Sequence, residues 1–284
     1  AQMKSITVTG STDLKITGAL DFANDATGVA GAIDGTVDAS AFTGKLTVTS
    51  AADEVSITGG SGNDTINMAG TLNGYDKIDG GDGTDTLTMN AAALSTQFAQ
   101  TSNIENVTFN ESNADTAVDM SKLPVGVEKF TADMADANDG GAKIALTVTK
   151  ADGKLINVAR SSADTGADAG DDDGVTMAVT NTVDTTDDTL NLMLTDIGLQ
   201  ADLGGLDSLD ASTYETINIT ANAVPTALGG DGKNEIVALT ATVAKTVTVD
   251  GSGAFNTALT GTKVTNFDAS DLAGALTLTA GSEK

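Results

Sequence analysis

The chain contains no cysteine, no histidine and no tryptophan, and aromatic residues make up only 3% of its 284 positions. Without histidine or cysteine it lacks the groups of Ser–His–Asp and Cys–His catalysis and the usual zinc ligands. Arg160 is the only arginine, so the chain has little with which to clamp a carboxylate or phosphate substrate. Paired carboxylates could in principle act as in glycosidases, but the aromatic platforms of sugar sites are nearly absent. The sequence therefore predicts a protein that is not an enzyme.

Basic residues are also few, with 14 against 40 acidic residues and a net charge of −26. Such a surface repels the phosphates of nucleic acid and does not attract anionic lipid. The excess charge destabilises a compact state by self-repulsion, which a calcium-rich medium would relieve. Because the chain cannot form disulfides, bound metal is the remaining means of cross-linking its fold. No apolar run approaches the length of a membrane-spanning helix, so direct membrane insertion is not expected.

One stretch, from Gly59 to Thr88, carries a repeated pattern. Gly59–Asn67 (GGSGNDTIN) and Gly80–Thr88 (GGDGTDTLT) each fit G-G-x-G-x-D-x-U-x, in which U is a bulky apolar residue. Thr71–Asp79 is a weaker copy that keeps Gly74, Asp76 and Ile78 at the fourth, sixth and eighth positions. This nine-residue pattern is typical of calcium-binding turns in parallel β-helices.

Each position of the pattern has a physical role. The glycines permit the positive-φ conformations of a tight turn and leave backbone carbonyls uncovered. Ca²⁺ takes six to eight oxygen ligands, and the aspartate at position six adds a carboxylate. The apolar residue at position eight (Ile66, Ile78 or Leu87) points into the interior of the coil. Gly59–Asn67 and Gly80–Thr88 are therefore expected to stack on one side with an ion between them, and Met68–Ala69–Gly70 is expected to bulge out of the coil.

The remainder of the chain is predicted to form short strands, most of them alternating with threonine on one face. The first two expected strands place Ile6, Val8, Leu14 and Ile16 inward. Ala91–Gln100 is the best candidate for a short helix. A core of Val, Ile, Leu, Ala and Thr suits thin stacked coils, so the sequence predicts an all-β protein. The expected strands are Lys4–Thr9, Asp13–Thr17, Lys45–Thr49, Glu54–Thr58, Ile104–Phe109, Val127–Thr131, Lys143–Thr149, Leu155–Ala159, Val175–Thr180, Thr189–Leu194, Glu215–Thr220, Glu235–Thr242, Lys245–Val249 and Ala275–Thr279.

An internal repeat supports a stacked architecture. VDASAFTGKLTVT (Val37–Thr49) and FDASDLAGALTLT (Phe267–Thr279) share Asp-Ala-Ser, a glycine and the alternating strand that follows. A partial copy, LDASTYETINIT, begins at Leu209. In each copy Asp-Ala-Ser is expected to form a hydrogen-bonded turn.

Two acidic clusters and one degenerate repeat leave alternatives open. The clusters are either solvated loops or secondary calcium sites. Gly229–Val237 (GGDGKNEIV) has the frame of the repeat, but Asn234 replaces the aspartate, which should weaken or abolish metal binding there. The clusters consist of Asp164, Asp168, Asp171, Asp172 and Asp173, and of Asp184, Asp187 and Asp188.

Three runs give the chain a likeness to a known family. They are Gly80–Phe109, Glu215–Ala223 (ETINITANA) and Thr262–Ser282, which contains NFDASDLAGALTLT. With the glycine repeats, they resemble the RTX surface-layer proteins of the Caulobacter type, and the likeness covers most of Ile57–Ser282. The resemblance implies a right-handed parallel β-solenoid (β-helix or β-roll) that carries many Ca²⁺ ions. It also implies type I secretion and two-dimensional crystallisation on the outer membrane.

The resemblance further implies a set of calcium ligands. The expected organisation is solenoid coils over residues 1–58, RTX calcium turns over 59–88 and irregular coils over 89–284. Binding of lipopolysaccharide and the export signal are expected to reside in regions outside these residues, since both ends of the sequence break off in mid-pattern and no signal peptide is visible. The implied ligands are Gly60, Gly62, Asp64, Asn73, Asp76, Gly81, Asp82, Gly83 and Asp85.

The expected function is that of an extracellular structural segment. It would fold on binding Ca²⁺ and join other copies of itself in a surface layer at the cell surface. The alternative is an adhesin or another extracellular binding module on the same calcium-dependent scaffold. Calcium-induced assembly into ordered sheets or oligomers would distinguish the first from the second.

Overall fold

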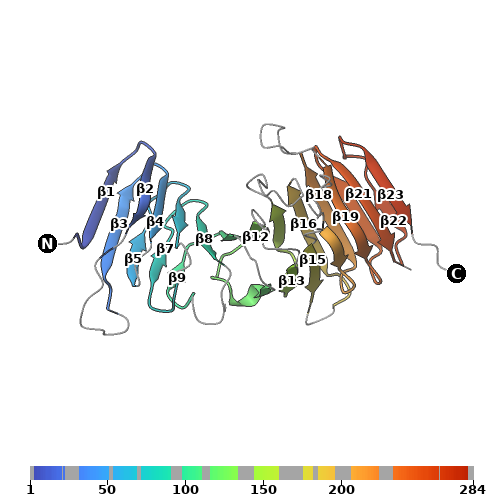
Figure 1. The fold of residues 1–284 in the computed structure, drawn as a ribbon, viewed down its shortest axis with the longest axis horizontal. Helices are drawn as coiled ribbons and strands as arrows, with labels where there is room; N and C mark the ends of the chain where they lie inside the picture. Colours follow the sequence, from blue (N-terminus) through green and yellow to red (C-terminus); the bar gives the residue numbers. More distant parts are fainter. Residues whose placement is uncertain are drawn as a thin grey trace, which may run out of the picture. The chain divides into compact units, whose positions relative to one another are not determined.

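The computed structural model describes residues 3–20, 22, 32–50, 54–68, 72–90, 98–110, 116–133, 144–159, 175–181, 185–195, 206–223, 233–261 and 263–280. Within these residues the chain is a parallel β-solenoid, as predicted (Figure 1). Successive strands alternate between walls, and each strand pairs in parallel with the strand two places along the chain, except that β9 ends one sheet and β11 begins another. In this described part no helix is long and apolar enough to cross a bilayer.

Three sheets, counted over the described residues, make up the walls. One follows the order β1 (Ser5–Gly10), β3 (Gly35–Phe42), β5 (Val55–Thr58), β7 (Lys77–Asp79) and β9 (Thr101–Ser102). A second follows the order β11 (Thr116–Asp119), β13 (Ile144–Thr149), β15 (Val175–Thr180), β17 (Leu206–Asp210), β19 (Lys233–Thr240), β21 (Ala254–Thr260) and β23 (Leu276–Ala280). The third contains all the even-numbered strands: β2 (Leu14–Leu20), β4 (Leu46–Ser50), β6 (Thr65–Asn67), β8 (Thr86–Asn90), β10 (Asn106–Asn110), β12 (Lys129–Asp133), β14 (Leu155–Ala159), β16 (Thr189–Thr195), β18 (Thr216–Asn222), β20 (Thr246–Asp250) and β22 (Asn266–Asp268).

The chain divides into two compact units. Unit 1 comprises Ala1–Asn110 and Ser121–Phe130, and unit 2 comprises Glu111–Met120 and Thr131–Lys284. The glycine repeats of Gly59–Thr88 lie inside unit 1.

The core of unit 1 is a set of apolar columns. Val48, Ile66, Leu87 and Val107 follow one another in register on β4, β6, β8 and β10, and all four are fully buried. Phe109 packs edge to face against Phe130, with ring centroids 5.0 Å apart. Because side chains alternate between the two faces of a strand, each inward apolar residue is flanked by an outward polar one.

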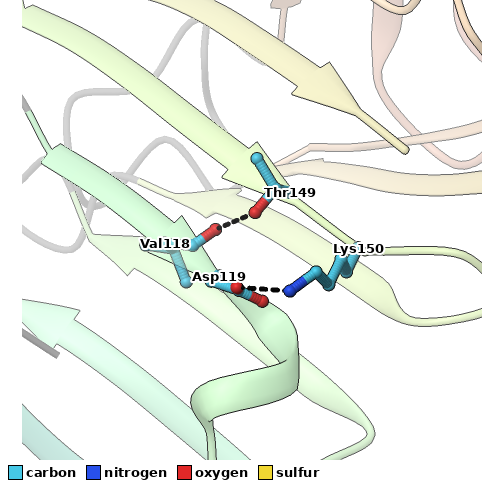
Figure 2. Close-up of polar contacts among 4 residues, drawn as sticks. All are labelled: Val118, Asp119, Thr149 and Lys150. Atoms are coloured by element: carbon cyan, nitrogen blue, oxygen red, sulfur yellow. Dashed lines mark hydrogen bonds and ion pairs between the residues drawn. The ribbon is translucent and has the colours of Figure 1, made fainter. Parts of the chain in front are cut away.

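Unit 2 shows the same alternation of burial, although Met193 takes one outward position of β16. β16 reads Thr-Leu-Asn-Leu-Met-Leu-Thr, and its three leucines are buried. Leu190 lies in register with Ile217 of β18, which lies in register with Val247 of β20. Near the start of this unit, Lys150 Nζ donates to Asp119 Oδ2 at 2.6 Å, beside the bond from the Thr149 hydroxyl to the Val118 carbonyl (Figure 2).

The Asp-Ala-Ser motifs form the predicted hydrogen bond in all three copies. The backbone N–H groups of Ser40, Ser212 and Ser270 each donate to the aspartate two residues earlier, at 3.0 Å. Asp210 and Asp268 end their strands, so there the motif is a turn. The first copy instead lies inside β3, where the register against β1 shifts between Thr7 and Thr9. The strand therefore continues through this motif as a bulge.

Several local predictions are corrected. Leu14, expected inward, is 37% exposed, because β2 is the edge strand of its sheet and has a neighbour on one side only. Met68, expected in a bulge, is fully buried, and its N–H donates to the Thr88 carbonyl at 2.9 Å. Of the predicted helix, residues 91–97 lie outside the described residues, and residues 98–100 form a turn. The described helical element is a short 3₁₀ turn, η1 (Met120–Lys122).

Candidate metal site

The site is built at one corner of the coil, where each even-numbered strand begins. We call the residue immediately before each of these strands a corner residue. In the described chain these residues are charged, except at β22. They are Asp13, Lys45, Asp64, Asp85, Glu105, Glu128, Lys154, Asp188, Glu215, Lys245 and Thr265.

Corner carboxylates of the glycine repeats accept backbone N–H groups from the coil before, whereas Asp13 Oδ1 accepts the N–H of Lys45 from the coil after, at 2.9 Å. The N–H of Asp64 donates to Asp85 Oδ1, and the N–H of Asp85 donates to Glu105 Oε2, both at 2.7 Å. Asp64 Oδ1 accepts the N–H of Leu46, also at 2.7 Å. Hydrogen bonds from backbone N–H to a carboxylate are charge-assisted and stronger than those between neutral groups. The aspartates of the glycine repeat thus hold consecutive coils together.

Asp64 and Asp76 have both carboxylate oxygens paired. Asp64 Oδ2 accepts the N–H of Gly60 at 2.7 Å. Asp76 accepts the N–H of Val55 at 2.9 Å and that of Asn73 at 2.7 Å. Both side chains are at most 1% exposed. Asp76 precedes β7 on the opposite wall, so the structure brings Asp64 and Asp85 together and keeps Asp76 apart.

Asp85 differs from the other two aspartates. It is 1% exposed, yet its Oδ2 has no hydrogen-bond partner among the described residues. The N–H of Gly81, which corresponds to that of Gly60 in the earlier repeat, donates instead to Asp79 Oδ1 at 3.2 Å. A buried carboxylate oxygen without a partner costs free energy, so the site favours either a cation or a proton there.

Burial raises the pKa of Asp85 to about 7. The negative charges of Asp64, Glu105 and Asp79 act in the same direction, whereas the hydrogen bond from the Asp64 N–H opposes the shift. This electrostatic environment disfavours an isolated anion and favours any species that supplies positive charge.

The glycines of the repeat are required by close approach between coils. A Cβ atom at Gly81 would lie 2.1 Å from the Gly60 carbonyl oxygen, and one at Gly83 would lie 2.5 Å from that of Gly62. Both residues have positive φ, +96° and +121°. The Gly60 carbonyl also accepts the N–H of Asp82 at 2.9 Å. The predicted stacking of Gly59–Asn67 on Gly80–Thr88 is therefore confirmed.

The residues fit calcium at the Asp85 turn better than at the other two. In the described ranges no group of three or more acidic side chains converges on one point. A cation here would therefore be held by one carboxylate and by carbonyl oxygens, which Ca²⁺ accepts as ligands. At Asp64 and Asp76 a cation would have to share or replace hydrogen bonds to backbone N–H groups.

The remaining predicted ligands take local roles. The Asn73 side-chain carbonyl accepts the N–H of Tyr75 at 2.8 Å. Asp82 is exposed. Metal binding by these residues, by Asp64 and Asp76 and by the glycine carbonyls stays a prediction.

Sequence reasoning missed Asn103, Glu105 and Glu215. Glu105 caps the N–H of Asp85, and Glu215 Oε2 accepts the N–H of Asp188 at 3.1 Å. Asn103 has a positive φ of 52°, and its side-chain amide donates to Asp79 Oδ1 at 2.7 Å. The signal that could have found the glutamates is an acidic residue directly before an alternating strand, as in Glu105-Asn-Val-Thr-Phe and Glu215-Thr-Ile-Asn-Ile.

Asp188 of the second acidic cluster and Asn234 of the degenerate repeat are both buried and hydrogen-bonded. Asp188 is 1% exposed, and the Thr185 hydroxyl and N–H donate to its two oxygens, which lowers its pKa. Asn234 is buried, and its amide donates to the Asn222 carbonyl at 3.0 Å. Residues 229–232, Asp184 and the cluster from Asp164 to Asp173 lie outside the described residues.

Comparison with known proteins gives no match to this chain, whether to a family model, a curated protein or a solved structure. The function proposed below therefore rests on the corner residues and on the sequence patterns described above.

Proposed function

We propose that this chain is a calcium-organised structural segment of an extracellular surface layer, which folds on binding Ca²⁺ and joins other copies in a two-dimensional lattice. The observation that carries the calcium part is the buried, unpaired Oδ2 of Asp85 in a glycine turn. The likeness of Gly80–Phe109 and Thr262–Ser282 to RTX surface-layer proteins supports the lattice part.

Charge supports a role that depends on calcium outside the cell. At low free calcium, a chain of net charge −26 repels its own coils and other copies. At roughly millimolar calcium, a site with a dissociation constant on the order of 10–100 μM stabilises the folded state by about 1.5 to 3 kcal/mol. Bridges between acidic surfaces are weaker and fill later, so assembly follows folding as calcium rises.

A second candidate function, an adhesin, is favoured by one specific feature. The outward positions of β4, β6, β8 and β10 form two columns of hydroxyl and amide side chains in register. Such columns present evenly spaced donors and acceptors to a repetitive glycan. They consist of Thr47, Thr65, Thr86 and Asn106, and of Thr49, Asn67 and Thr108, the second column being interrupted by the buried Thr88.

The experiment is a calcium titration of the purified chain, from micromolar to tens of millimolar. Far-UV circular dichroism follows folding, and light scattering follows particle size. We expect β signal to appear first and particle size to rise steeply afterwards, with Mg²⁺ a poor substitute because it demands a tighter octahedral shell. An EDTA spectrum equal to the calcium-loaded one would refute the structural role of the metal. A particle that stays monomeric and binds a glycan would replace the lattice with the adhesin.

A further inference from the structure

We infer that a Ca²⁺ site lies between the Gly80–Asp85 turn and the following coil, with Asp85 Oδ2 and the backbone carbonyl of Asn103 as ligands. Asn103 belongs to neither glycine repeat, so this site is additional to one held between the two repeats. It rests on the proposed function, because it takes the ion to be calcium.

The two oxygens converge beside Gly80. A Cβ atom at Gly80 would lie 1.9 Å from the Asn103 carbonyl oxygen and 2.5 Å from Asp85 Oδ2. The two oxygens are therefore at most 4.4 Å apart, which is the sum of those distances. Since each calcium–oxygen bond is about 2.3–2.6 Å long, one ion can contact both. Only glycine leaves this space, so the side chain missing at Gly80 makes the site possible.

The same arrangement occurs one coil earlier with one difference. A Cβ atom at Gly59 would lie 2.1 Å from the Gly80 carbonyl oxygen and 2.5 Å from Asp64 Oδ2. Asn103 thus supplies to the Asp85 turn the carbonyl that Gly80 supplies to the Asp64 turn. However, Asp64 Oδ2 accepts the N–H of Gly60, whereas Asp85 Oδ2 accepts none among the described residues. Two facing oxygens without a donor between them repel each other unless a cation or a proton joins them.

The backbone of Asn103 is held in the required conformation. Its φ of 52° lies in the left-handed region, which asparagine adopts more readily than most residues. Its amide is tied to Asp79 Oδ1 at 2.7 Å, and the carbonyl of Ser102 accepts the N–H of Gly80 at 3.1 Å. A non-glycine residue in this region carries strain, which the surrounding bonds offset.

Acidic neighbours supply the field that attracts a cation. Asp79 and Glu105 each place a carboxylate on a backbone N–H of the Asp85 turn. Together with Asp64 they surround Asp85 with negative charge. Further backbone carbonyls and water complete the shell, since Ca²⁺ accepts both.

The test follows the ¹³C resonances of the Asn103 carbonyl and the Asp85 carboxyl during a calcium titration of the full chain, which sucrose keeps folded before calcium is added. We expect both carbons to shift together in one saturable step. In Asp85→Asn, which keeps the shape and removes the charge, the Asn103 shift should disappear and calorimetry should count one ion fewer. Asp188→Asn, at the equally buried corner of unit 2, is the matched control and should keep the Asn103 shift. Asn103→Gly retains the carbonyl and tolerates positive φ but loses the bond to Asp79, so it should weaken calcium binding without abolishing it.

Each contrary result overturns the site. An Asp85 carboxyl that shifts while the Asn103 carbonyl does not places the ion elsewhere. An Asp85 carboxyl that titrates near neutral pH and ignores calcium means that a proton occupies the space. Loss of binding in Asn103→Gly would show that the side chain, not the carbonyl, matters. Should Asp85→Asn fail to fold, the two resonances of the unaltered chain still decide. Calcium-dependent folding and assembly with a silent Asn103 would remove this site and leave the proposed function standing.

Discussion

Asp85 in unit 1 and Asp188 in unit 2 occupy the same kind of corner and have opposite electrostatics. Each directly precedes an even-numbered strand, each is 1% exposed, and each donates its N–H to a glutamate one coil later. Burial raises the pKa of Asp85 to about 7, whereas the hydrogen bonds from Thr185 lower the pKa of Asp188.

The residue three places earlier accounts for much of the difference. Thr185 stands at that place before Asp188 and supplies a hydroxyl and an N–H. Asp82 stands there before Asp85, and a carboxylate has no proton to donate. Thr185 therefore pairs both carboxylate oxygens of Asp188. In the glycine and aspartate turn before Asp85, one carboxylate oxygen is left without a donor and can take a cation.

The largest effect should come from a side chain placed between the glycine turns. Gly81→Ala adds a Cβ 2.1 Å from the Gly60 carbonyl oxygen at a φ of +96°. Gly153→Ala, next to the Asp188 corner, also has positive φ, but nothing lies within 4 Å. We expect Gly81→Ala to lower the free energy of unfolding by about 3 kcal/mol or more and Gly153→Ala by about 1 to 2 kcal/mol, measured by urea denaturation. Equal losses would show that the coils do not approach closely at Gly81.

A smaller effect, reduced by solvent screening around the turn, is expected from pH. The folded pKa of Asp85 is raised from 3.8, so in EDTA its contribution to stability is full below about pH 4 and is lost as pH rises through about 7. The folded pKa of Asp188 is lowered from 3.8, so its contribution is present above that value and is lost as pH falls through the lowered pKa. Denaturation from pH 3 to 8 in EDTA, with sucrose present to keep the calcium-free chain folded, should show a decline toward neutral pH that Asp85→Asn removes. Saturating Ca²⁺ should remove it too, and a decline unaltered by both would contradict the assignment.

The smallest effect should come from removing the Thr185 hydroxyl at the Asp188 corner. Thr185→Val deletes the hydroxyl that donates to Asp188 Oδ1 and should lower the free energy of unfolding by about 1 kcal/mol. It should also raise the pKa of Asp188, measured by NMR titration, and so make this corner more like Asp85. Thr186→Val is the control, because Thr186 is exposed and next in sequence. The same pKa in both variants would mean that Thr185 does not set the charge state of Asp188.

Much of the fold could be predicted from local alternation. The bounds predicted for Leu155–Ala159 and Val175–Thr180 are those of β14 and β15, because each is a short, mainly apolar run between clear breaks. β3 was missed because Asp38-Ala-Ser is typical of a turn, and only pairing with β1 shows that the strand continues as a bulge. The exposure of Leu14 depends on its place at a sheet edge, which the alternation of one strand does not contain.

The metal site was less predictable, because its residues come from different coils and meet only when the coils stack. The glycine pattern marks Asp76 as part of a weaker copy, but it indicates Asp64 and Asp85 as equals, and their local sequences do not distinguish these two. What separates Asp85 is the diversion of the Gly81 N–H to Asp79 and the arrival of Glu105 from 20 residues away. Glu105 follows a turn without glycine, so a search for the repeat passes over it.

In the glycine repeats each corner hydrogen bond links a coil to the coil that follows it, so the stability of one coil depends on its neighbour. The N–H of Asp64 is capped by Asp85, 21 residues later, and that of Asp85 by Glu105. A coil at the growing end of a nucleus thus keeps a bare donor until its successor docks, and each docking step completes the coil beneath it. Growth by nearest-neighbour steps costs little chain entropy, because each step closes only a short loop. Docking of a neighbouring coil therefore forms one of these hydrogen bonds, whichever of the two coils is already folded.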